Sequence, residues 1–291
     1  MCKLMMRERK AIEILLSLEA FKVFLGFASL PYEKDLNAIQ LEAVRCIFNT
    51  IYIRPEFISQ LLDASLYKSL FELTQVSQSF EYHTLLWKCL LASFEQPKAI
   101  TFVIVECNVY DVILKTAHCC IATFDFLCNP NMMALVVELI KAMFVITSHH
   151  KDASIAAEWP TIDKIMLMLT SILQQPNANL TMDMKLQTVN CLLVMQHPAY
   201  IENFVELGVC KHLVTLLEVT ADLSGISMSP PRNTRNDLRD GLLSFMTSLN
   251  TDLKRCVSEF LFTLCQKNPL EFTQRTGMGN AVALLRMKGL V

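Results

Sequence analysis

The stretch that decides the fold runs from Leu249 to Val291 and reads LNTDLKRCVSEFLFTLCQKNPLEFTQRTGMGNAVALLRMKGLV. Within its segment Asp252–Cys265, apolar residues recur at the spacing of one helix face. These residues are Leu253, Val257, Phe260, Leu261 and Leu264. The pattern predicts an amphipathic helix that buries Phe260, Leu261 and Leu264, packed together with Leu242, Phe245 and Met246 of the segment before it.

The same periodicity recurs along the rest of the chain. Leu36–Ile53 repeats it, and Pro55 ends that segment because proline cannot continue the helical hydrogen-bond ladder. No strand alternation extends beyond a few residues, and only the β-branched run Thr101–Val105 offers a strand as a minor alternative. The chain has only 7 glycines, which argues against a turn-rich β fold. We therefore expect an all-α protein.

An internal repeat organises these helices. The similar segments are LDASLYKSL (Leu62–Leu70), VECNVYDVI (Val105–Ile113), VELGVCKHL (Val205–Leu213) and a degenerate copy, QRTGMGNAV (Gln274–Val282). Each places a small or polar turn residue before a periodic apolar helix. The acids Asp63 and Glu106 stand 43 residues apart, which matches the ~40–47-residue period of armadillo and HEAT arrays. We expect an armadillo/HEAT-like α-solenoid of stacked helical repeats, with a compact helical domain as the alternative.

The whole chain, residues 1–291, is expected to form one such solenoid. Its main repeats span about residues 11–222 and its C-terminal repeats about residues 237–291. Between them, the segment at about 223–236 contains LSGISMSPPRNTRN, which is polar and carries Pro230 and Pro231. This composition is typical of a linker.

Composition and motifs exclude several functions. The formal net charge of −2 argues against nucleic acid as a partner, although a local basic patch stays open. The 11 cysteines contain no CxxC pair and no zinc-ligand spacing, which favours free thiols in the core of a reduced, cytoplasmic protein. The apolar run Met132–Thr147 is broken by Glu138 and Lys141 and is shorter than the ~20 residues of a membrane span. We expect a buried helix there and no membrane insertion.

Catalytic motifs are equally sparse. Gly277-Met-Gly279 lacks the third glycine and the βαβ setting of a dinucleotide loop, so a helix-entry turn is the simpler interpretation. His149-His150 has no acidic or cysteine partner at a metal-ligand spacing, which favours a solvated loop. Cys119-Cys120 has apolar surroundings that would raise the pKa of a nucleophilic thiol. We expect a binding protein with no catalytic residue, bound metal or cofactor.

Asn49 is the clearest polar feature for binding, because it lies inside the apolar helical run CIFNTIYI. Asparagine is mildly unfavourable in a helix interior. Its amide is expected either to bond the backbone of a neighbouring repeat or to contact a bound peptide. Arg45, one turn earlier, lies on the same side of the helix and is either a second contact or a solvated charge.

Beyond these patterns, the chain resembles the synembryn family. Residues 250–291 resemble that family's run DTDVKR…EFLFVLC…TGYGNAAGLL almost position by position. Weaker similarity extends back to about Leu36, through AVRCIFN (Ala43–Asn49), KAMFVIT (Lys141–Thr147) and HPAYIENFVELGVCKHLVTLLE (His197–Glu218). The family consists of chaperones and guanine nucleotide exchange factors for the α subunits of heterotrimeric G proteins (Gα).

The resemblance implies a solenoid whose concave face holds the Gα C-terminal helix and which stabilises nucleotide-free Gα. It implies a monomer in the cytoplasm, with the cell cortex as a further location. Asn49 and Phe144 are contact candidates because they match the family's runs, whereas Arg45 is a candidate only through its proximity to Asn49. A generic solenoid adaptor or transport-type peptide-binding module without exchange activity is the alternative function.

The chain also departs from the family pattern. Val145, and a position near Val194, replace two members of the family's asparagine series. We expect the chain to lack the first repeat or two, about one repeat between Thr220 and Pro230, and the tail that follows Val291.

Overall fold

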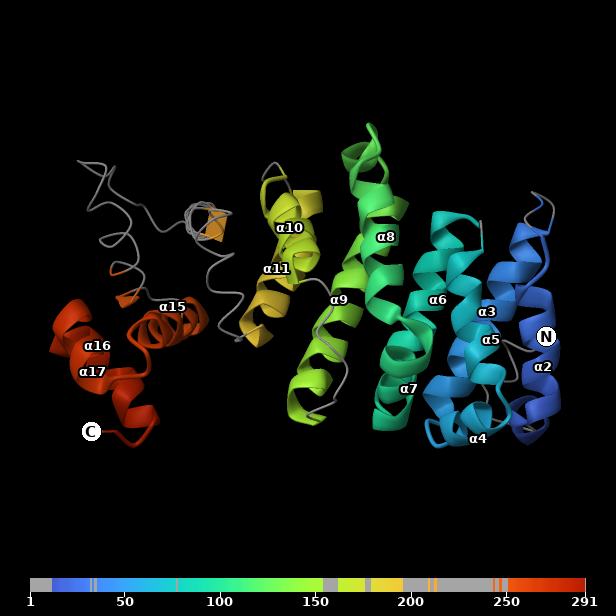
Figure 1. Ribbon diagram of the computed structural model, residues 1–291, viewed down its shortest axis with the longest axis horizontal. Coiled ribbons are helices and arrows are strands. Elements are labelled where there is room, and N and C mark those ends of the chain that lie inside the picture. Colours follow the sequence, from blue (N-terminus) through green and yellow to red (C-terminus); the bar gives the residue numbers. More distant parts are fainter. Residues whose placement is uncertain are drawn as a thin grey trace. The chain divides into compact units, whose positions relative to one another are not determined.

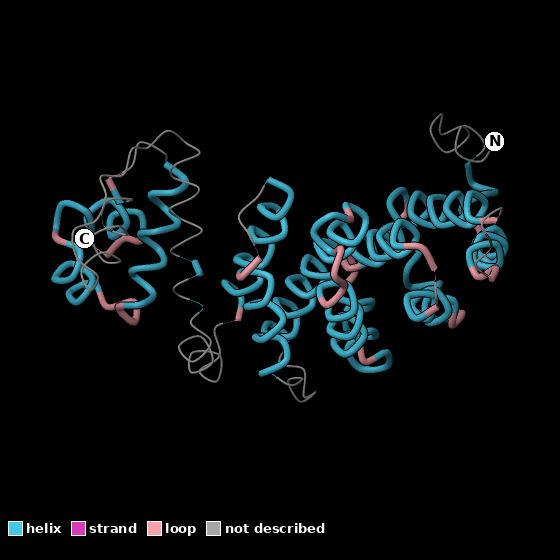
Figure 2. Tube along the Cα trace, turned by 90° about the horizontal axis from the view of Figure 1, so that it is seen from above, coloured by secondary structure: helices cyan, strands magenta, loops and turns pink. Residues whose placement is uncertain are grey.

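The computed structural model describes residues 12–31, 33, 36–76, 78–153, 162–175, 179–195, 209, 212–213, 243, 246–247 and 251–290. The chain divides into two compact units, Met1–Val209 and Cys210–Val291. Every regular element within the described ranges is a helix (Figures 1 and 2). The expectation of an all-α protein is therefore confirmed for these residues. The strand alternative at Thr101–Val105 is wrong, because these residues lie within a helix. The linker expected at about 223–236 lies outside the described residues.

The helices of the first unit are α2 (Leu18–Ala28), α3 (Asn37–Ile53), α4 (Phe57–Asp63), α5 (Leu66–Glu72), α6 (Phe80–Ser93), α7 (Pro97–Cys107), α8 (Val109–Ile121), α9 (Pro130–Ala153), α10 (Ile162–Leu173) and α11 (Asn179–Val194). The second unit contains α15 (Thr251–Leu264), α16 (Pro269–Thr276) and α17 (Met278–Met287). Short 3₁₀ segments lie at Ile12–Leu16, Leu73–Gln75 and Phe126–Cys128.

Five helices of the first unit pack in succession. α2 packs against α3, α3 against α6, α6 against α9, and α9 against α11 (Figure 1). A second series, α5, α7, α8 and α10, packs in the same order beside the first. Local signals start these helices: the hydroxyls of Ser17 and Ser79 accept from the amides of Ala20 and Tyr82, each at 3.2 Å. These bonds satisfy amides that would otherwise lack a partner at a helix N-terminus.

α9 is the longest apolar helix of the described chain. The stretch Pro130–His149 is long and apolar enough to cross a membrane, with a mean hydropathy of 1.6. However, 67% of that window is buried against other parts of the protein. A core helix passes the same length and hydropathy test, and the burial matches the buried helix predicted for Met132–Thr147.

The turn residue of the internal repeat has a positive φ in each described copy. Ser65 separates α4 from α5 with φ 59°, Asn108 separates α7 from α8 with φ 51°, and Gly277 separates α16 from α17 with φ 85°. All three occupy the same position of the repeated segment, whose turn was predicted; the third copy's Gly208 lies outside the described residues. Positive φ reverses the helical path in one residue and favours glycine or asparagine over most other residues. The repeat therefore encodes a helix–turn–helix unit.

Ser65 is the least suited of these turn residues, so its substitution is informative. We expect Ser65→Gly to be tolerated and Ser65→Val to lower the free energy of unfolding by about 1–2 kcal/mol, because a β-branched side chain clashes at positive φ. Urea denaturation measures both changes. The matched control Ser59→Val lies inside α4 and should cost less than about 0.7 kcal/mol. Equal losses at the two positions would show that the turn conformation carries no such constraint.

The core of the second unit corrects the predicted helix face. Phe262 is 4% exposed and packs edge-to-face on Phe272 at 5.3 Å, in a cluster with Met246. Met246 is buried as predicted, whereas Phe260 and Leu261 are only partly buried against that cluster, so the prediction of their burial holds only in part. α15 contacts both α16 and α17, and these two neighbours shift its buried arc toward Phe262. Leu242, Phe245 and the side chain of Leu264 lie outside the described residues.

The eight cysteines whose side chains the structure describes are all free thiols. Five of them are buried: Cys46, Cys89, Cys120, Cys191 and Cys265. Cys107 is half-buried, whereas Cys119 and Cys128 are exposed. Their predicted core placement therefore holds for most of these residues and is wrong for Cys119 and Cys128.

Candidate functional site

Arg45 and Asn49 lie on the accessible face of α3. Glu42, Arg45, Asn49 and Tyr52 follow one another at intervals of three or four residues, so they line one side of the helix. All four keep accessible surface, whereas Val44, Ile47 and Ile51 are fully buried. The amphipathic pattern that predicted the helix thus also orients the two candidate residues outward.

Arg45 links α3 to α6, the helix that packs against it. Its guanidinium donates to Glu42 one turn earlier and to Oε1 of Glu81 on α6 at 3.2 Å. The Arg45 side chain is 35% exposed, so this pairing contributes about 0–1 kcal/mol to stability. Its main effect is to hold the guanidinium where α3 and α6 meet. The interpretation of Arg45 as a solvated charge is therefore incomplete.

Asn49 is half-buried and its amide has no hydrogen-bond partner within the described structure. No hydrogen bond from the Asn49 side chain to the backbone of a neighbouring repeat is present among the described residues, and both interpretations of Asn49 stay predictions. An amide that is partly desolvated and unpaired gains a hydrogen bond when a partner with a matching backbone group approaches. Asn49 is thus an available donor and acceptor at the centre of the α3 face.

Phe144 lies two helices away from these residues, on α9. It is half-buried, as is its neighbour Val145, and α6 lies between α9 and α3 in the packing order. Neighbouring helix axes are about 8–10 Å apart, which places α9 about 16–20 Å from α3. The structure therefore does not bring Phe144 into contact with Arg45 or Asn49. A bound helix of about 13 residues, roughly 20 Å long, would reach from one to the other.

An aromatic pair on α3 was not predicted from the sequence. The rings of Phe48 and Tyr52 stack with centroids 5.9 Å apart and an interplanar angle of 12°. Tyr52 is 66% exposed. The signal was present in the run CIFNTIYI as two aromatic residues four positions apart around Asn49. We call the accessible side chains of α3, α6 and α9 the row surface; on α6 they include Leu85 and Lys88.

Groups suited to covalent chemistry are not assembled in the described part of the chain. There, no cluster of three or more His, Cys, Asp or Glu side chains could hold a metal ion. Burial raises the pKa of the Cys120 thiol to about 11, which makes it a poor nucleophile at neutral pH. Gly277 caps the start of α17, as expected for a helix-entry turn. His149 lies in α9 rather than in the predicted loop.

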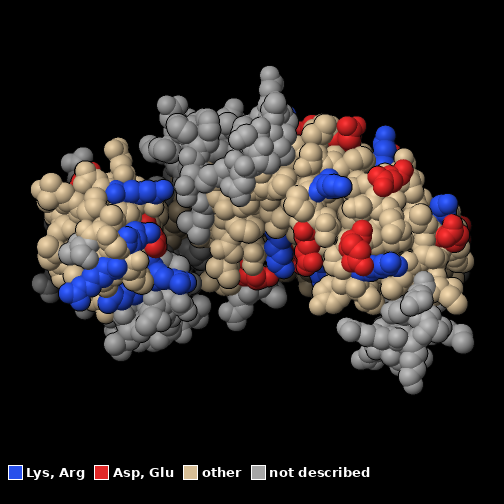
Figure 3. Space-filling model, turned by 90° about the horizontal axis from the view of Figure 1, so that it is seen from below, with Lys and Arg blue, Asp and Glu red and all other residues tan. Residues whose placement is uncertain are grey.

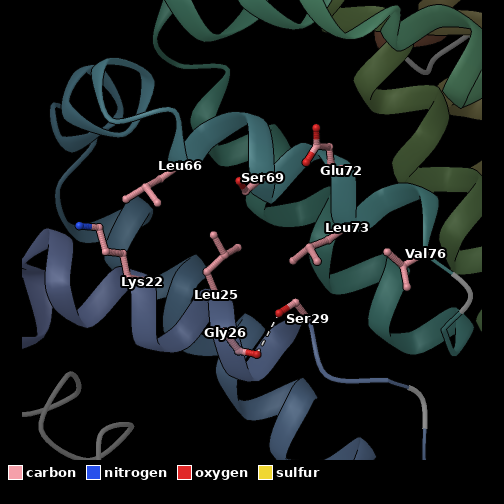
Figure 4. A pocket seen from close by; sticks show the side chains of 9 residues that line it. All are labelled: Lys22, Leu25, Gly26, Ser29, Leu66, Ser69, Glu72, Leu73 and Val76. Carbon is pink, nitrogen blue, oxygen red and sulfur yellow. Dashed lines mark hydrogen bonds between the residues drawn. The ribbon is translucent and has the colours of Figure 1, made fainter.

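A separate groove lies between α2 and α5. It has a volume of about 480 Å³, and Leu25, Leu66, Leu73 and Val76 supply its apolar lining (Figure 4). Lys22 and Glu72 stand on opposite sides of it (Figure 4). None of Arg45, Asn49 and Phe144 lines this groove, so the candidate site for a partner is the row surface instead.

The second unit presents a different charge. Its described basic residues, Lys254, Arg255, Lys267, Arg275, Arg286 and Lys288, outnumber the acidic residues of the same range, Asp252, Glu259 and Glu271. Figure 3 shows Lys and Arg predominating on the face of this unit that is in view. Lys288 pairs with Glu259 at 2.9 Å, and Arg275 pairs with Glu271 at 2.7 Å. This unit is therefore more basic than the net charge of −2 suggests.

These features define a class of protein: a helical protein whose accessible helix faces supply its candidate site. Comparison with known proteins identifies the family. The chain matches the family described as guanine nucleotide exchange factor synembryn over residues 2–222 and 223–291, and it belongs to that family. The resemblance inferred from residues 250–291 is thereby confirmed.

Curated relatives match a shorter part of the chain. It is 48% identical over 56 residues to "Chaperone Ric-8A" of Xenopus laevis, 46% over 56 residues to that of Gallus gallus, and 48% over 54 residues to that of Mus musculus. Each match covers 19% of this chain and 10% of the relative.

Proposed function

We propose that this protein is a chaperone and guanine nucleotide exchange factor for Gα subunits, and that the Gα C-terminal helix binds the row surface. Membership of the synembryn family is the observation that carries this proposal. The names of the relatives support the chaperone activity. The family's exchange activity and the Gα partner come to this chain by that membership. The protein acts in the cytoplasm, including its cortex, where Gα subunits reside.

The first unit is an armadillo/HEAT-like solenoid in this proposal. The ordered packing of α2, α3, α6, α9 and α11 beside a second series of helices supports it, as does the positive-φ turn shared by the repeats. Stacked repeats of this kind bury a continuous core and leave a long concave face. The row surface, formed by one helix of each repeat, corresponds to that face.

Exchange requires no covalent step by this chain. The protein binds Gα better when the nucleotide site is empty, so it shifts Gα toward the open, nucleotide-free state by its difference in affinity for the two states. Reciprocally, nucleotide binding weakens the complex by the same factor. Along the row surface, apolar groups such as Phe144 supply burial for an amphipathic helix, and Arg45 and Asn49 fix its register.

A generic adaptor that grips an extended peptide is the second candidate. The solvent-facing pattern of α3 and α6, which mixes charged and apolar side chains, would suit that role as well. The two candidates differ in one respect: an adaptor does not discriminate between GDP-bound and nucleotide-free Gα.

The deciding experiment measures binding of purified Gα subunits of each class, with GDP and without nucleotide. For at least one Gα class, we expect this protein to bind the nucleotide-free form more tightly than the GDP-bound form and to accelerate GDP release. We also expect it to bind a peptide that contains the C-terminal helix of that Gα. Asn49→Ala should weaken peptide binding by about 1–3 kcal/mol, because it leaves a partner group unsatisfied, and Arg45→Glu should weaken it through charge reversal.

The matched control is Lys115→Glu, which reverses an exposed charge on α8, outside the row surface. It should bind like the parent. Circular dichroism must show intact helicity in all variants. Equal affinity for GDP-bound and nucleotide-free Gα would favour the adaptor. Unchanged binding by Asn49→Ala and Arg45→Glu would move the site elsewhere while leaving the family assignment intact.

A further inference from the structure

We propose that the stacked pair Phe48–Tyr52 is the apolar anchor of the row surface, and that it selects partner helices with a bulky apolar side chain opposite α3. The inference rests on the proposed function, because the occupant of the surface is the Gα C-terminal helix. It assigns a specificity-determining role to two residues that no sequence motif singled out.

The geometry of the pair is unusual for side chains that merely cover a core. The rings are almost parallel, at 12°, with centroids 5.9 Å apart, and the outer ring belongs to Tyr52, which is 66% exposed. Ile47 and Ile51, next to the pair in sequence, are fully buried, so the pair lies at the edge of the buried face of α3. Tyr52 therefore exposes aromatic surface on a rigid helix, and contact with a partner there costs little conformational entropy.

The face of α3 that carries the pair also carries a charged group. Toward the start of α3 lies the charged group formed by Arg45, Glu42 and Glu81. Toward its end lies the aromatic pair, whose two residues flank Asn49 in sequence. A helix laid on α3 therefore meets polar groups at one end and an apolar platform at the other. This sets which way round an amphipathic helix docks.

The energetics favour the ring rather than the hydroxyl of Tyr52. The Tyr52 hydroxyl has no partner within the described structure, so it remains in water in the free protein. Aromatic residues dominate the energy of protein interfaces through the apolar area that they bury. Replacing the ring should therefore weaken binding strongly, whereas removing the hydroxyl alone should not.

The test uses the full chain and a fluorescently labelled peptide of the Gα C-terminal helix, followed by fluorescence anisotropy. Tyr52→Ala should raise the Kd by about 10- to 30-fold, the range of an interface hot spot. Tyr52→Phe should stay within about twofold of the parent, since it keeps the ring. The control is Phe124→Ala, because Phe124 is a fully exposed aromatic residue outside the row surface; it should also stay within about twofold.

An alanine scan of the peptide completes the experiment. One bulky apolar position should show a non-additive effect with Tyr52→Ala, which identifies the side chain that contacts the ring. If Tyr52→Ala binds like the parent while Asn49→Ala and Arg45→Glu bind more weakly, the anchor is overturned and the proposed function stands. If Phe124→Ala weakens binding as much as Tyr52→Ala, the anchor is also overturned. If the parent binds no Gα peptide, both proposals fall.

Discussion

Replacing Trp87 by alanine is expected to lower the free energy of unfolding by about 3–5 kcal/mol, the range for large aromatic residues of a core. Trp87 is fully buried on α6, and its ring packs edge-to-face on Phe71 at 6.4 Å. α6 itself packs between α3 and α9. The cavity left by the indole would therefore open between α3 and α9, and these tightly packed neighbours limit how far the structure can relax to fill it.

Trp87→Phe separates packing from hydrogen bonding. The indole Nε1 of Trp87 is buried without a hydrogen-bond partner. Phenylalanine removes that unpaired donor while keeping much of the ring volume, so we expect it to cost clearly less than alanine. Urea denaturation followed by far-ultraviolet circular dichroism measures both losses. Equal losses would contradict the prediction that the cavity decides the cost.

A second large effect is expected at alkaline pH. Burial raises the pKa of Cys191 to about 12 and that of Cys120 to about 11, and it raises the pKa of Cys89 still further. These thiols ionise in the unfolded chain near their ordinary pKa of about 9 but stay protonated in the native protein. The folded protein therefore favours the protonated thiols. As the pH rises, the unfolded chain loses these protons first, and the free energy of unfolding falls.

The sign of the pH dependence follows from these raised values. The stabilisation is fully present below about pH 9 and is lost as the pH rises toward the native pKa values. Between about pH 9 and 11, each such thiol lowers the free energy of unfolding by about 1.4 kcal/mol per pH unit. Three thiols acting together give a fall of about 4 kcal/mol per pH unit, and the raised pKa of Tyr110, about 12, adds to it at higher pH.

Cysteine variants test this assignment. Cys191→Ala should reduce the slope of stability against pH by about one proton between pH 9 and 11, apart from any loss at neutral pH from the smaller side chain. Cys128→Ala is the control, because Cys128 is exposed in the 3₁₀ segment Phe126–Cys128, and it should leave the slope unchanged. A slope in Cys191→Ala equal to that of the parent would contradict the assignment to this thiol.

Local sequence patterns determined much of this protein. Helical periodicity predicted α3 and α15 within the described chain, because apolar residues at one-face spacing have no other way to bury their side chains. The repeated turn position predicted where helices change direction, since only a few residue types suit the positive φ found at Ser65, Asn108 and Gly277. The long run in residues 250–291 also carried the family resemblance.

The candidate site was predictable only in part. The spacing of Arg45 and Asn49 placed them on one accessible helix face, as the structure has them. The sequence did not reveal that Arg45 bridges to Glu81 on α6, because 36 residues separate the two in the chain. Nor did it single out the Phe48–Tyr52 stack, since two aromatic residues one turn apart are as often core as surface until the neighbouring helices are placed.

What tertiary structure decided was the choice of face wherever a helix has several neighbours. The sequence by itself established an amphipathic α15, but Phe260 and Phe262 are both apolar and only two residues apart. Contacts with α16 and α17 buried Phe262 against Phe272 and left Phe260 at the margin. Periodicity defines an arc of a helix, whereas the number and direction of its packing partners define which part of that arc is removed from water.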